Sequence, residues 1–317
     1  MSEYPGHGGA AGRLERSMLF VPASRWPMIV KAARSAADAV CIDLEDAVAP
    51  AEKEAARANV VRAFRELDFG PRLRIYRINA LDTAFAYRDL IDVLEPAGDR
   101  IDLVMVPKVG GPEDLAFVDR LLTQIELARG RARRVGIEAQ IETARGFLYA
   151  REIAAASPRL ETLIYGPGDY AAELRAPLAS IGERDEQDEL YPGHRWHAVM
   201  HTIVAAARAN GLRCLDGPFA GLKAPAELER ASWVARAMGF DGKQCIHPAQ
   251  LEIVNRVFSP PAAEVAWAEA VLRAYAAAVA QGRGAVSLDG KMIDAANIRV
   301  AQVIVDQQRR IQEREGG

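Results

Sequence analysis

Carboxylate side chains follow two successive apolar runs of the sequence. Glu142 ends the run 135–142, and Asp169 follows the run 160–168. If these runs are adjacent strands, two negative charges lie close together and repel each other unless a cation sits between them. Mg²⁺ suits such a pair, because it takes one or two protein carboxylates and fills its other positions with water and substrate oxygens. We therefore expect Mg²⁺, with Mn²⁺ as an alternative ion, at Glu142 and Asp169.

Arg77 offers a planar guanidinium that can bind a carboxylate through two parallel hydrogen bonds. We expect it to hold a substrate carboxylate, and the alternative is a salt bridge to Glu45 or Asp46. The Gly-Pro-Gly segment 166–168 beside Asp169 indicates backbone N–H groups close to a ligand, although glycine here also suits a simple turn.

Zinc and redox chemistry receive less support. His197 and His201 stand four residues apart, with His194 nearby, but no carboxylate or cysteine completes a zinc site at a suitable spacing. The three cysteines lie in short apolar runs without C-x-x-C spacing, so we interpret them as buried, reduced thiols.

The elements that must position these groups alternate between apolar runs and Ala-rich amphipathic stretches, such as 51–67 and 112–128. Eight such alternations predict an α/β fold, a (β/α)₈ TIM barrel, in preference to an open doubly wound sheet. Chemistry in a barrel collects at the C-terminal strand ends, where Asp43, Lys108, Asp216 and His247 also fall. Any one of them alone could be a solvated rim charge. The predicted strands are 17–23, 38–45, 72–79, 102–109, 135–142, 160–168, 211–218 and 242–248.

Two segments depart from the regular alternation. The connection 175–196 is long and acidic, which is typical of a functional or mobile loop. After the barrel, predicted over 16–259, a C-terminal extension of residues 260–317 contains a helix (262–281), a hairpin at Asp289-Gly290 and a last helix (295–313).

Composition restricts the functional classes. The chain has 317 residues, a formal net charge of −3 and 26% charged residues, so it lacks the basic character of a nucleic-acid binder. No apolar run is long enough to span a bilayer, so we expect no membrane contact. Residues 1–15 are Gly-rich and polar and predict a flexible leader without a signal peptide, which indicates the cytoplasm.

Several longer motifs resemble the HpcH/HpaI aldolase and citrate lyase β-subunit superfamily. The similarity extends from residue 16 to about residue 310 and is greatest to the malyl-CoA, β-methylmalyl-CoA and citramalyl-CoA lyases. The motifs include RSMLFVPASR (16–25), DLEDAVAPAEKEAAR (43–57), VPKVGGPEDL (106–115), IETARG (141–146), GPGDYAAEL (166–174), GFDGKQCIHPAQLEIVNRVFSP (239–260) and GAVSLDGKMIDAANI (284–298).

The resemblance implies a Mg²⁺-dependent barrel that assembles as homotrimers or homohexamers, with the extension covering a neighbouring active site. It implies that Glu142 and Asp169 bind the metal, with Glu45 and Asp46 acting through water. It implies that the substrate contacts Arg77, Gly168 and Asp169 and that Asp294 is an acid/base acting in a neighbouring subunit. Asp294 alternatively caps the last helix. It places coenzyme A along Phe20, Arg25 and Lys31, with its adenine end near His247 and Pro248.

The activity implied is a reversible Claisen-type cleavage of a carboxylated 3-hydroxyacyl-CoA. The products are a 2-oxoacid, glyoxylate or pyruvate, and acetyl-CoA or propionyl-CoA. Three alternatives stay open: a malyl-CoA thioesterase, a citrate lyase β subunit acting on an acyl-carrier protein, and a phosphoenolpyruvate mutase-like or isocitrate lyase-like barrel. Ala80 replaces a glycine common in relatives, and the 175–196 loop has an intermediate length, so the sequence leaves the acyl group undetermined.

Overall fold

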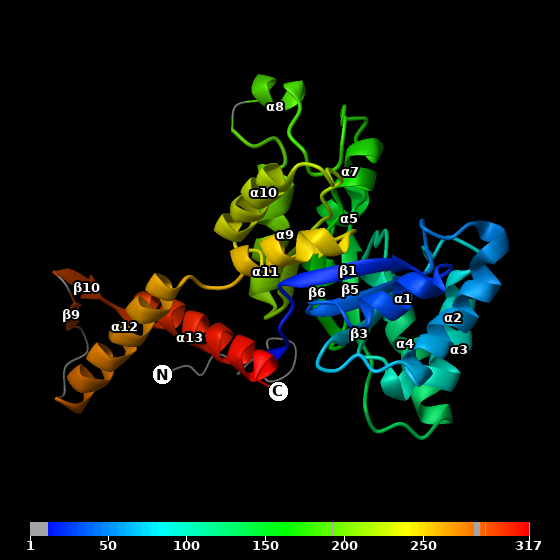
Figure 1. Ribbon diagram of the computed structural model, residues 1–317, viewed down its shortest axis with the longest axis horizontal. Helices are drawn as coiled ribbons and strands as arrows, with labels where there is room; N and C mark the ends of the chain where they lie inside the picture. Colours follow the sequence, from blue (N-terminus) through cyan, green and yellow to red (C-terminus); the bar gives the residue numbers. More distant parts are fainter. Residues whose placement is uncertain (1–11, 192, 282–285, 289, 317) are drawn as a thin grey trace. The chain divides into compact units, whose positions relative to one another are not determined.

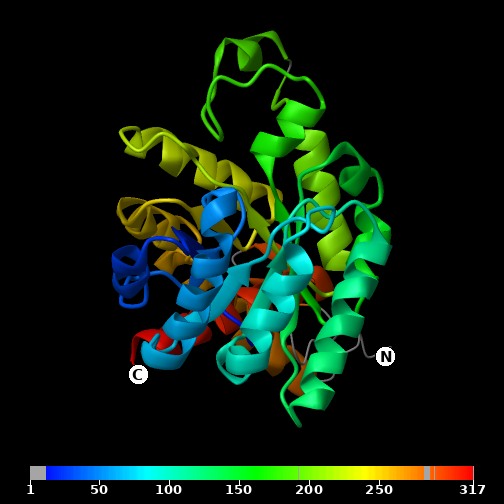
Figure 2. The same cartoon turned by 90° about the vertical axis from the view of Figure 1, so that its right-hand side faces the viewer.

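The computed structural model describes residues 12–191, 193–281, 286–288 and 290–316. Its larger part is a closed barrel of eight parallel strands in sequence order, with β8 paired to β1 (Figures 1 and 2). The predicted (β/α)₈ fold is therefore confirmed, and the open doubly wound sheet is excluded. The strands are β1 Ser17–Pro22, β2 Ala39–Asp43, β3 Leu73–Arg77, β4 Leu103–Val106, β5 Gly136–Ile141, β6 Leu160–Tyr165, β7 Arg213–Asp216 and β8 Gly242–Cys245.

Alternate positions of the strands fill the barrel interior. Successive side chains of a strand point to opposite faces. Asp43 therefore shares the inward face with Cys41, and Arg77 shares it with Ile75. The polar groups at the strand ends thus stand directly above the apolar core of the barrel. That core is a fully buried cluster of Met18, Ala39, Cys41, Ile75, Leu103, Met105, Ile164 and Leu215.

Helices connect the strands and form an outer layer around them, as Figure 2 shows for the first half of the chain. The predicted helix 112–128 matches α4, with Pro112 in its first turn. The predicted helix 51–67 begins as a short 3₁₀ helix, Pro50–Glu52, and continues as α2. The helices of this part are α1 Trp26–Ala32, α2 Lys53–Glu66, α3 Ala86–Ala97, α4 Pro112–Ala128, α5 Ala144–Leu148, α6 Ala150–Ala154, α7 Pro167–Glu173, α8 Glu186–Leu190, α9 His197–Ala209, α10 Pro225–Met238 and α11 Leu251–Val257.

The segment before β1 reaches into buried structure. Residues 1–11 of the predicted leader lie outside the described residues. Glu15, within the same predicted leader, is only 2% exposed and pairs with Arg213 over 2.9 Å. A carboxylate buried with a guanidinium partner holds its segment in place, so the ordered part of the barrel begins before residue 16.

The long connection between β6 and β7 carries α7 and α8 and projects beyond the rest of the barrel (Figures 1 and 2). Asp185 caps α8, and Arg195 pairs with Asp185 and Asp188 over 3.1 and 3.2 Å. These ion pairs tie the C-terminal end of the acidic loop to its middle. Part of the loop therefore has a defined local structure.

The residues from Val257 onward form a separate unit. Helix α12 (Ala262–Ala280) packs on α13 (Ala295–Glu315) around Ala268, Val271 and Ala301. Between them β9 (Val286–Leu288) and β10 (Lys291–Ile293) pair antiparallel, as the predicted hairpin requires. Asp289 of the predicted turn lies outside the described residues. No helix in the described ranges is both long and apolar enough to span a bilayer.

Candidate functional site

Glu142 and Asp169 both line a cavity of about 580 Å³ at the end of the barrel where the C-terminal ends of the strands meet. Glu142 directly follows β5, and Asp169 lies in the first turn of α7, just after β6. Since β5 and β6 are hydrogen-bonded neighbours, the two predicted metal carboxylates are brought to one place. Other lining residues are Phe20, Met28, Asp43, Asp46, Arg77, Gln140, Gly166, Pro167, Gly168, Ile181, Pro218, Gln244 and Ile246.

Glu142 is 2% exposed and held at both oxygens. Its Oε1 accepts a hydrogen bond from the backbone N–H of Lys108 at 2.9 Å, and its Oε2 accepts one from Gln140 Nε2 at 2.6 Å. Burial, together with the nearby charges of Glu45 and Asp169, raises the pKa of Glu142 to about 8. The charge of Arg77 offsets only part of this rise in pKa, and a metal ion would supply further positive charge that favours the ionised carboxylate.

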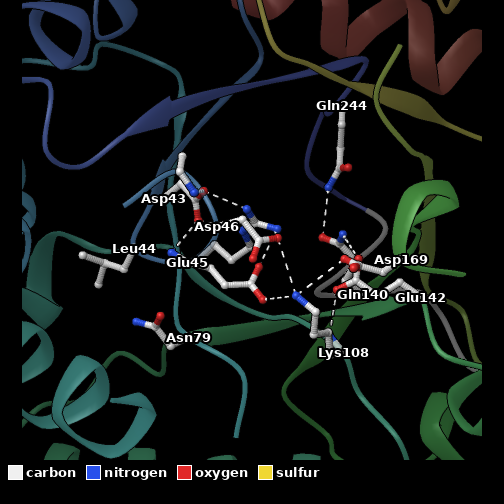
Figure 3. Close-up of polar contacts among 12 residues, drawn as sticks. Asp43, Leu44, Glu45, Asp46, Asn79, Lys108, Gln140, Glu142, Asp169 and Gln244 are labelled. Atoms are coloured by element: carbon white, nitrogen blue, oxygen red, sulfur yellow. Dashed lines mark hydrogen bonds and ion pairs between the residues drawn. The ribbon is translucent and has the colours of Figure 1, made fainter. Parts of the chain in front are cut away.

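The charges around the cavity do not balance (Figure 3). Five carboxylates face two cationic side chains, so a divalent cation fits the remaining negative charge. Within the described ranges, no three His, Cys, Asp or Glu side chains gather closely enough to hold a metal alone. Two protein carboxylates plus water and substrate oxygens therefore match the residues present and suit Mg²⁺. The charged groups are Asp43, Glu45, Asp46, Glu142, Asp169, Arg77 and Lys108.

Arg77 is already engaged by acidic partners. Its Nε and Nη2 each donate to the Asp43 carboxylate at 2.7 Å, and its Nη1 lies 2.7 Å from Glu45 Oε2. Burial alone would lower the pKa of Arg77, but Asp43 and Glu45 hold it well above its usual value. We expected the two parallel donors of Arg77 to be available to a substrate carboxylate. This expectation is corrected, because both donors bind Asp43. Only the remaining N–H groups of Arg77 can meet a ligand in the cavity.

Glu45 and Asp46 follow β2 and face Lys108. Lys108 Nζ lies 2.5 Å from Glu45 Oε1 and 3.5 Å from Asp46 Oδ2. Lys53 Nζ also holds this acidic segment, by donating to the backbone oxygens of Leu44 and Glu45 at 2.6 and 2.7 Å. The segment is therefore fixed by lysines, and its carboxylates point toward Lys108 (Figure 3).

The glycines of the segment 166–168 are required by space. A Cβ on Gly166 would lie 2.4 Å from Glu142 Cβ, and a Cβ on Gly168 would lie 2.9 Å from Ile181 Cδ1. Neither residue has a positive φ. Glycine at 166 lets Glu142 approach the end of β6, and glycine at 168 leaves room for Ile181 from the long loop.

The residues expected to bind coenzyme A lie in β1, at the two ends of α1 and directly after β8. Phe20 lines the cavity, and the Arg77 guanidinium lies 5.2 Å from its ring centre. Arg25 and Lys31, at the two ends of α1, are exposed. His247 accepts a hydrogen bond from Ala249 N at 3.1 Å. His247 and Pro248 are also exposed, and they follow Ile246, which lines the cavity.

Asp294 lies in the C-terminal unit, where it caps α13. Its Oδ1 accepts hydrogen bonds from the backbone N–H groups of Ala296 and Asn297 at 2.8 and 3.1 Å. The backbone N–H of Asp294 in turn donates to Asn297 Oδ1 at 3.0 Å. The alternative role as a helix cap is thus present, and the side chain is exposed.

A second cavity, of about 650 Å³, lies beside the long loop. Tyr165 and Asp216 line this second cavity. Each directly follows a residue that points into the barrel, Ile164 or Leu215, so their side chains point to the outside of the barrel. This cavity contains neither Glu142, Asp169 nor Arg77, and the smaller cavity is therefore the candidate active site.

Sequence reasoning assigned no role to several residues that build the site. Asp43 and Lys108 were noted only as polar strand ends, although Asp43 pairs with Arg77 and Lys108 contacts four acidic residues. Gln140 and Gln244 were missed, and they are joined by a 3.3 Å hydrogen bond next to Glu142 (Figure 3). Their signal in the sequence is a polar residue at an inward position of an otherwise apolar strand.

Comparisons with known proteins find similar sequences and similar solved structures. The profile of the HpcH/HpaI aldolase/citrate lyase family matches residues 16–248. L-malyl-CoA/beta-methylmalyl-CoA lyase of Cereibacter sphaeroides is 43% identical over 301 residues, covering 93% of this chain and 95% of the relative. A (3S)-malyl-CoA thioesterase of that species is 38% identical, covering 90% and 92%. CitE of Mycobacterium tuberculosis, crystallised with magnesium, acetoacetate and coenzyme A, has a TM-score of 0.72 at 32% identity, covering 95% and 98%.

Proposed function

Because the chain belongs to the HpcH/HpaI aldolase/citrate lyase family, we propose that it is a Mg²⁺-dependent carbon–carbon lyase acting on acyl-CoA thioesters. It cleaves a carboxylated 3-hydroxyacyl-CoA, such as malyl-CoA or β-methylmalyl-CoA, into a 2-oxoacid and acetyl-CoA or propionyl-CoA. The observation that carries the proposal is the pair Glu142 and Asp169 at one cavity, within an excess of negative charge and beside Arg77.

In this proposal Glu142 and Asp169 hold the cation. Bound Mg²⁺ supplies Lewis-acid stabilisation of negative charge on a substrate oxygen. The free N–H groups of Arg77 bind the substrate carboxylate, while Asp43 fixes the orientation of the guanidinium. The substrate contacts Asp169 and the backbone of Gly168, where the missing side chain leaves room for Ile181.

The acid/base role is assigned to Asp294 of a neighbouring chain. In the condensation direction its carboxylate removes a proton from the carbon next to the thioester, and the enolate attacks the carbonyl of the 2-oxoacid. A carboxylate is a weak base for this carbon acid, so the site must stabilise the enolate oxygen and exclude water. We propose that the unit 260–317 provides this cover in a homotrimer or homohexamer.

Coenzyme A is assigned to the side of the cavity lined by Phe20. Its thioester end lies near Phe20, and its phosphates lie near the exposed cations Arg25 and Lys31. Its adenine end lies near His247 and Pro248. The cysteines are free, which suits a reducing compartment such as the cytoplasm.

A thioesterase is the second candidate, because a relative with that name covers 90% of this chain at 38% identity. Both reactions start from the same thioester. The thioesterase breaks its carbon–sulfur bond with water, whereas the lyase breaks a carbon–carbon bond of the acyl group. The similarity to CitE keeps a citrate lyase β-type activity as a third candidate, which would need an acyl-carrier protein in place of free coenzyme A.

The condensation assay separates these candidates. Purified protein is incubated with Mg²⁺, glyoxylate or pyruvate, and acetyl-CoA or propionyl-CoA, and the coenzyme A esters are weighed by mass spectrometry. We expect a new ester whose mass is the sum of the two substrates, formed only with Mg²⁺. If no ester forms with free coenzyme A substrates in any combination, the lyase proposal fails.

A further inference from the structure

Lys108 follows β4 and has no part in the mechanism above, yet it is placed at high conformational cost. Its φ is 51°, in the left-handed region that favours glycine. Only one other non-glycine residue in the described ranges, Arg175, has a positive φ. Strain of this kind persists at functional sites when the surrounding contacts demand a particular side chain.

Those contacts join Lys108 to every acidic residue assigned to the metal. Its Nζ lies 2.5 Å from Glu45 Oε1, 3.5 Å from Asp46 Oδ2 and 3.5 Å from Asp169 Oδ2. Its backbone N–H donates to Glu142 Oε1 at 2.9 Å. Figure 3 shows the ammonium between the acidic segment after β2 and Asp169.

Among the described residues, Lys108 is one of two cationic side chains that pair with the carboxylates of the site. The other cation at the cavity, Arg77, is turned toward Asp43 and Glu45. Lys108 is therefore the cation that faces Asp169.

We infer that Lys108 is a positioning residue that acts as a resident counter-cation, holding the metal carboxylates in place and competing electrostatically with the divalent ion for Asp169. This inference rests on the proposed metal role of Glu142 and Asp169. In the metal-free protein the ammonium offsets repulsion between Glu45, Asp46 and Asp169. When a divalent ion binds, the same positive charge opposes it and weakens its binding.

The inference predicts opposite effects on binding and turnover. Without the ammonium, the site gains a full negative charge, so Mg²⁺ and Mn²⁺ bind more tightly. Turnover falls, because the extra negative charge disfavours the alkoxide and enolate that develop during the reaction. If Lys108 had a purely structural role, its loss would weaken metal binding and turnover together.

Four variants separate charge from backbone. Lys108→Met removes the ammonium and keeps an unbranched side chain, and Lys108→Gly removes it while suiting the left-handed backbone. Lys108→Arg keeps the charge. Lys223→Met, at an exposed lysine on the segment before α10, changes the net charge equally and serves as the control. The backbone N–H to Glu142 is retained in every variant.

The measurement is Mg²⁺ binding by calorimetry and Mn²⁺ binding by electron paramagnetic resonance, on metal-stripped protein without substrate. We expect the Kd of Lys108→Met and Lys108→Gly to fall on the order of tenfold, while Lys108→Arg and Lys223→Met stay near the wild type. Circular dichroism checks that each variant is folded. If Lys108→Met does not fold, the metal affinity of Lys108→Gly decides the test.

Two results have distinct meanings. An unchanged or weaker metal affinity in folded Lys108→Met or Lys108→Gly overturns the inference. If the wild-type protein binds neither Mg²⁺ nor Mn²⁺, the proposed function itself fails at its metal site.

Discussion

The backbone N–H of Lys108 donates a 2.9 Å hydrogen bond to Oε1 of Glu142, joining the end of β4 to the end of β5. Gln140 donates to the other oxygen of the same carboxylate at 2.6 Å. Glu142 is thus fixed before any ligand arrives. Preorganisation of this kind makes the carboxylate a good metal ligand and also makes it sensitive to small substitutions.

Neutral replacements of the metal carboxylates should remove metal and activity but keep the fold. Glu142→Gln retains the shape of the side chain and loses the charge that the cation needs, as does Asp169→Asn. We expect kcat to fall on the order of 10²–10³-fold or more, as befits the loss of several kcal/mol of transition-state stabilisation. Calorimetry with Mg²⁺ checks the loss of metal binding, and circular dichroism checks that the fold is kept. Unchanged turnover at saturating Mg²⁺ would refute the metal assignment.

Metal binding should depend on pH through Glu142. Burial raises the pKa of Glu142 to about 8 in the metal-free protein, so below this pH a proton must leave before the metal binds. Affinity should rise by up to about tenfold per pH unit toward pH 8 and then level off. At pH 7, calorimetry in buffers of different ionisation enthalpy should report about one proton released per Mg²⁺. Binding without proton release would show that Glu142 is already ionised.

The same shift fixes the sign of a stability effect in the metal-free protein. The pKa of Glu142 is raised in the folded state, so the folded state binds more protons than the unfolded state between the ordinary glutamate pKa and about 8. Stability from this group is present at the low end of that window and is lost as pH rises through about 8.

Arg77 variants should lose both substrate binding and stability. Arg77→Lys cannot keep the two parallel bonds to Asp43 while reaching the substrate, so KM for the 2-oxoacid should rise, at a cost of about 1.5–3 kcal/mol. Arg77→Ala leaves the buried Asp43 carboxylate without its partner, which costs about 3–5 kcal/mol of folding stability. Steady-state kinetics and thermal unfolding check these effects. If KM changes only for the coenzyme A ester, the role of Arg77 is misassigned.

The sequence predicted the eight strands because each is a continuous apolar run with helical periodicity on either side. It also placed Glu142 and Asp169 together, since the ends of neighbouring parallel strands meet at one edge. It named Glu45 as a possible partner of Arg77, and Glu45 Oε2 lies 2.7 Å from Arg77 Nη1. It did not predict the second partner, Asp43, because Asp43 lies 34 residues away and nothing in the spacing selects it. The left-handed turn at Lys108 was equally hidden, since lysine carries no signal for such a conformation.

Asp294 should complete the active site of a neighbouring chain. Asp294→Ala and Glu142→Gln should each be nearly inactive, and mixed oligomers of the two should recover part of the activity after subunit exchange. Glu142→Gln serves here instead of an Arg77 truncation, because the latter leaves Asp43 unpaired. Asp294→Asn is the matched control, since asparagine keeps the cap of α13 but cannot act as a base. No recovery, with exchange confirmed by mass, would place the site within one chain.

The central claim, that this chain breaks a carbon–carbon bond, is tested most directly by the products formed from malyl-CoA. The 2-oxoacid, acetyl-CoA, malate and free coenzyme A are quantified in one reaction with Mg²⁺, and Glu142→Gln serves as the negative control. We predict glyoxylate and acetyl-CoA in equal amounts, with no release of free coenzyme A. Malate and free coenzyme A in equal amounts, with no glyoxylate, would contradict the claim and identify a thioesterase.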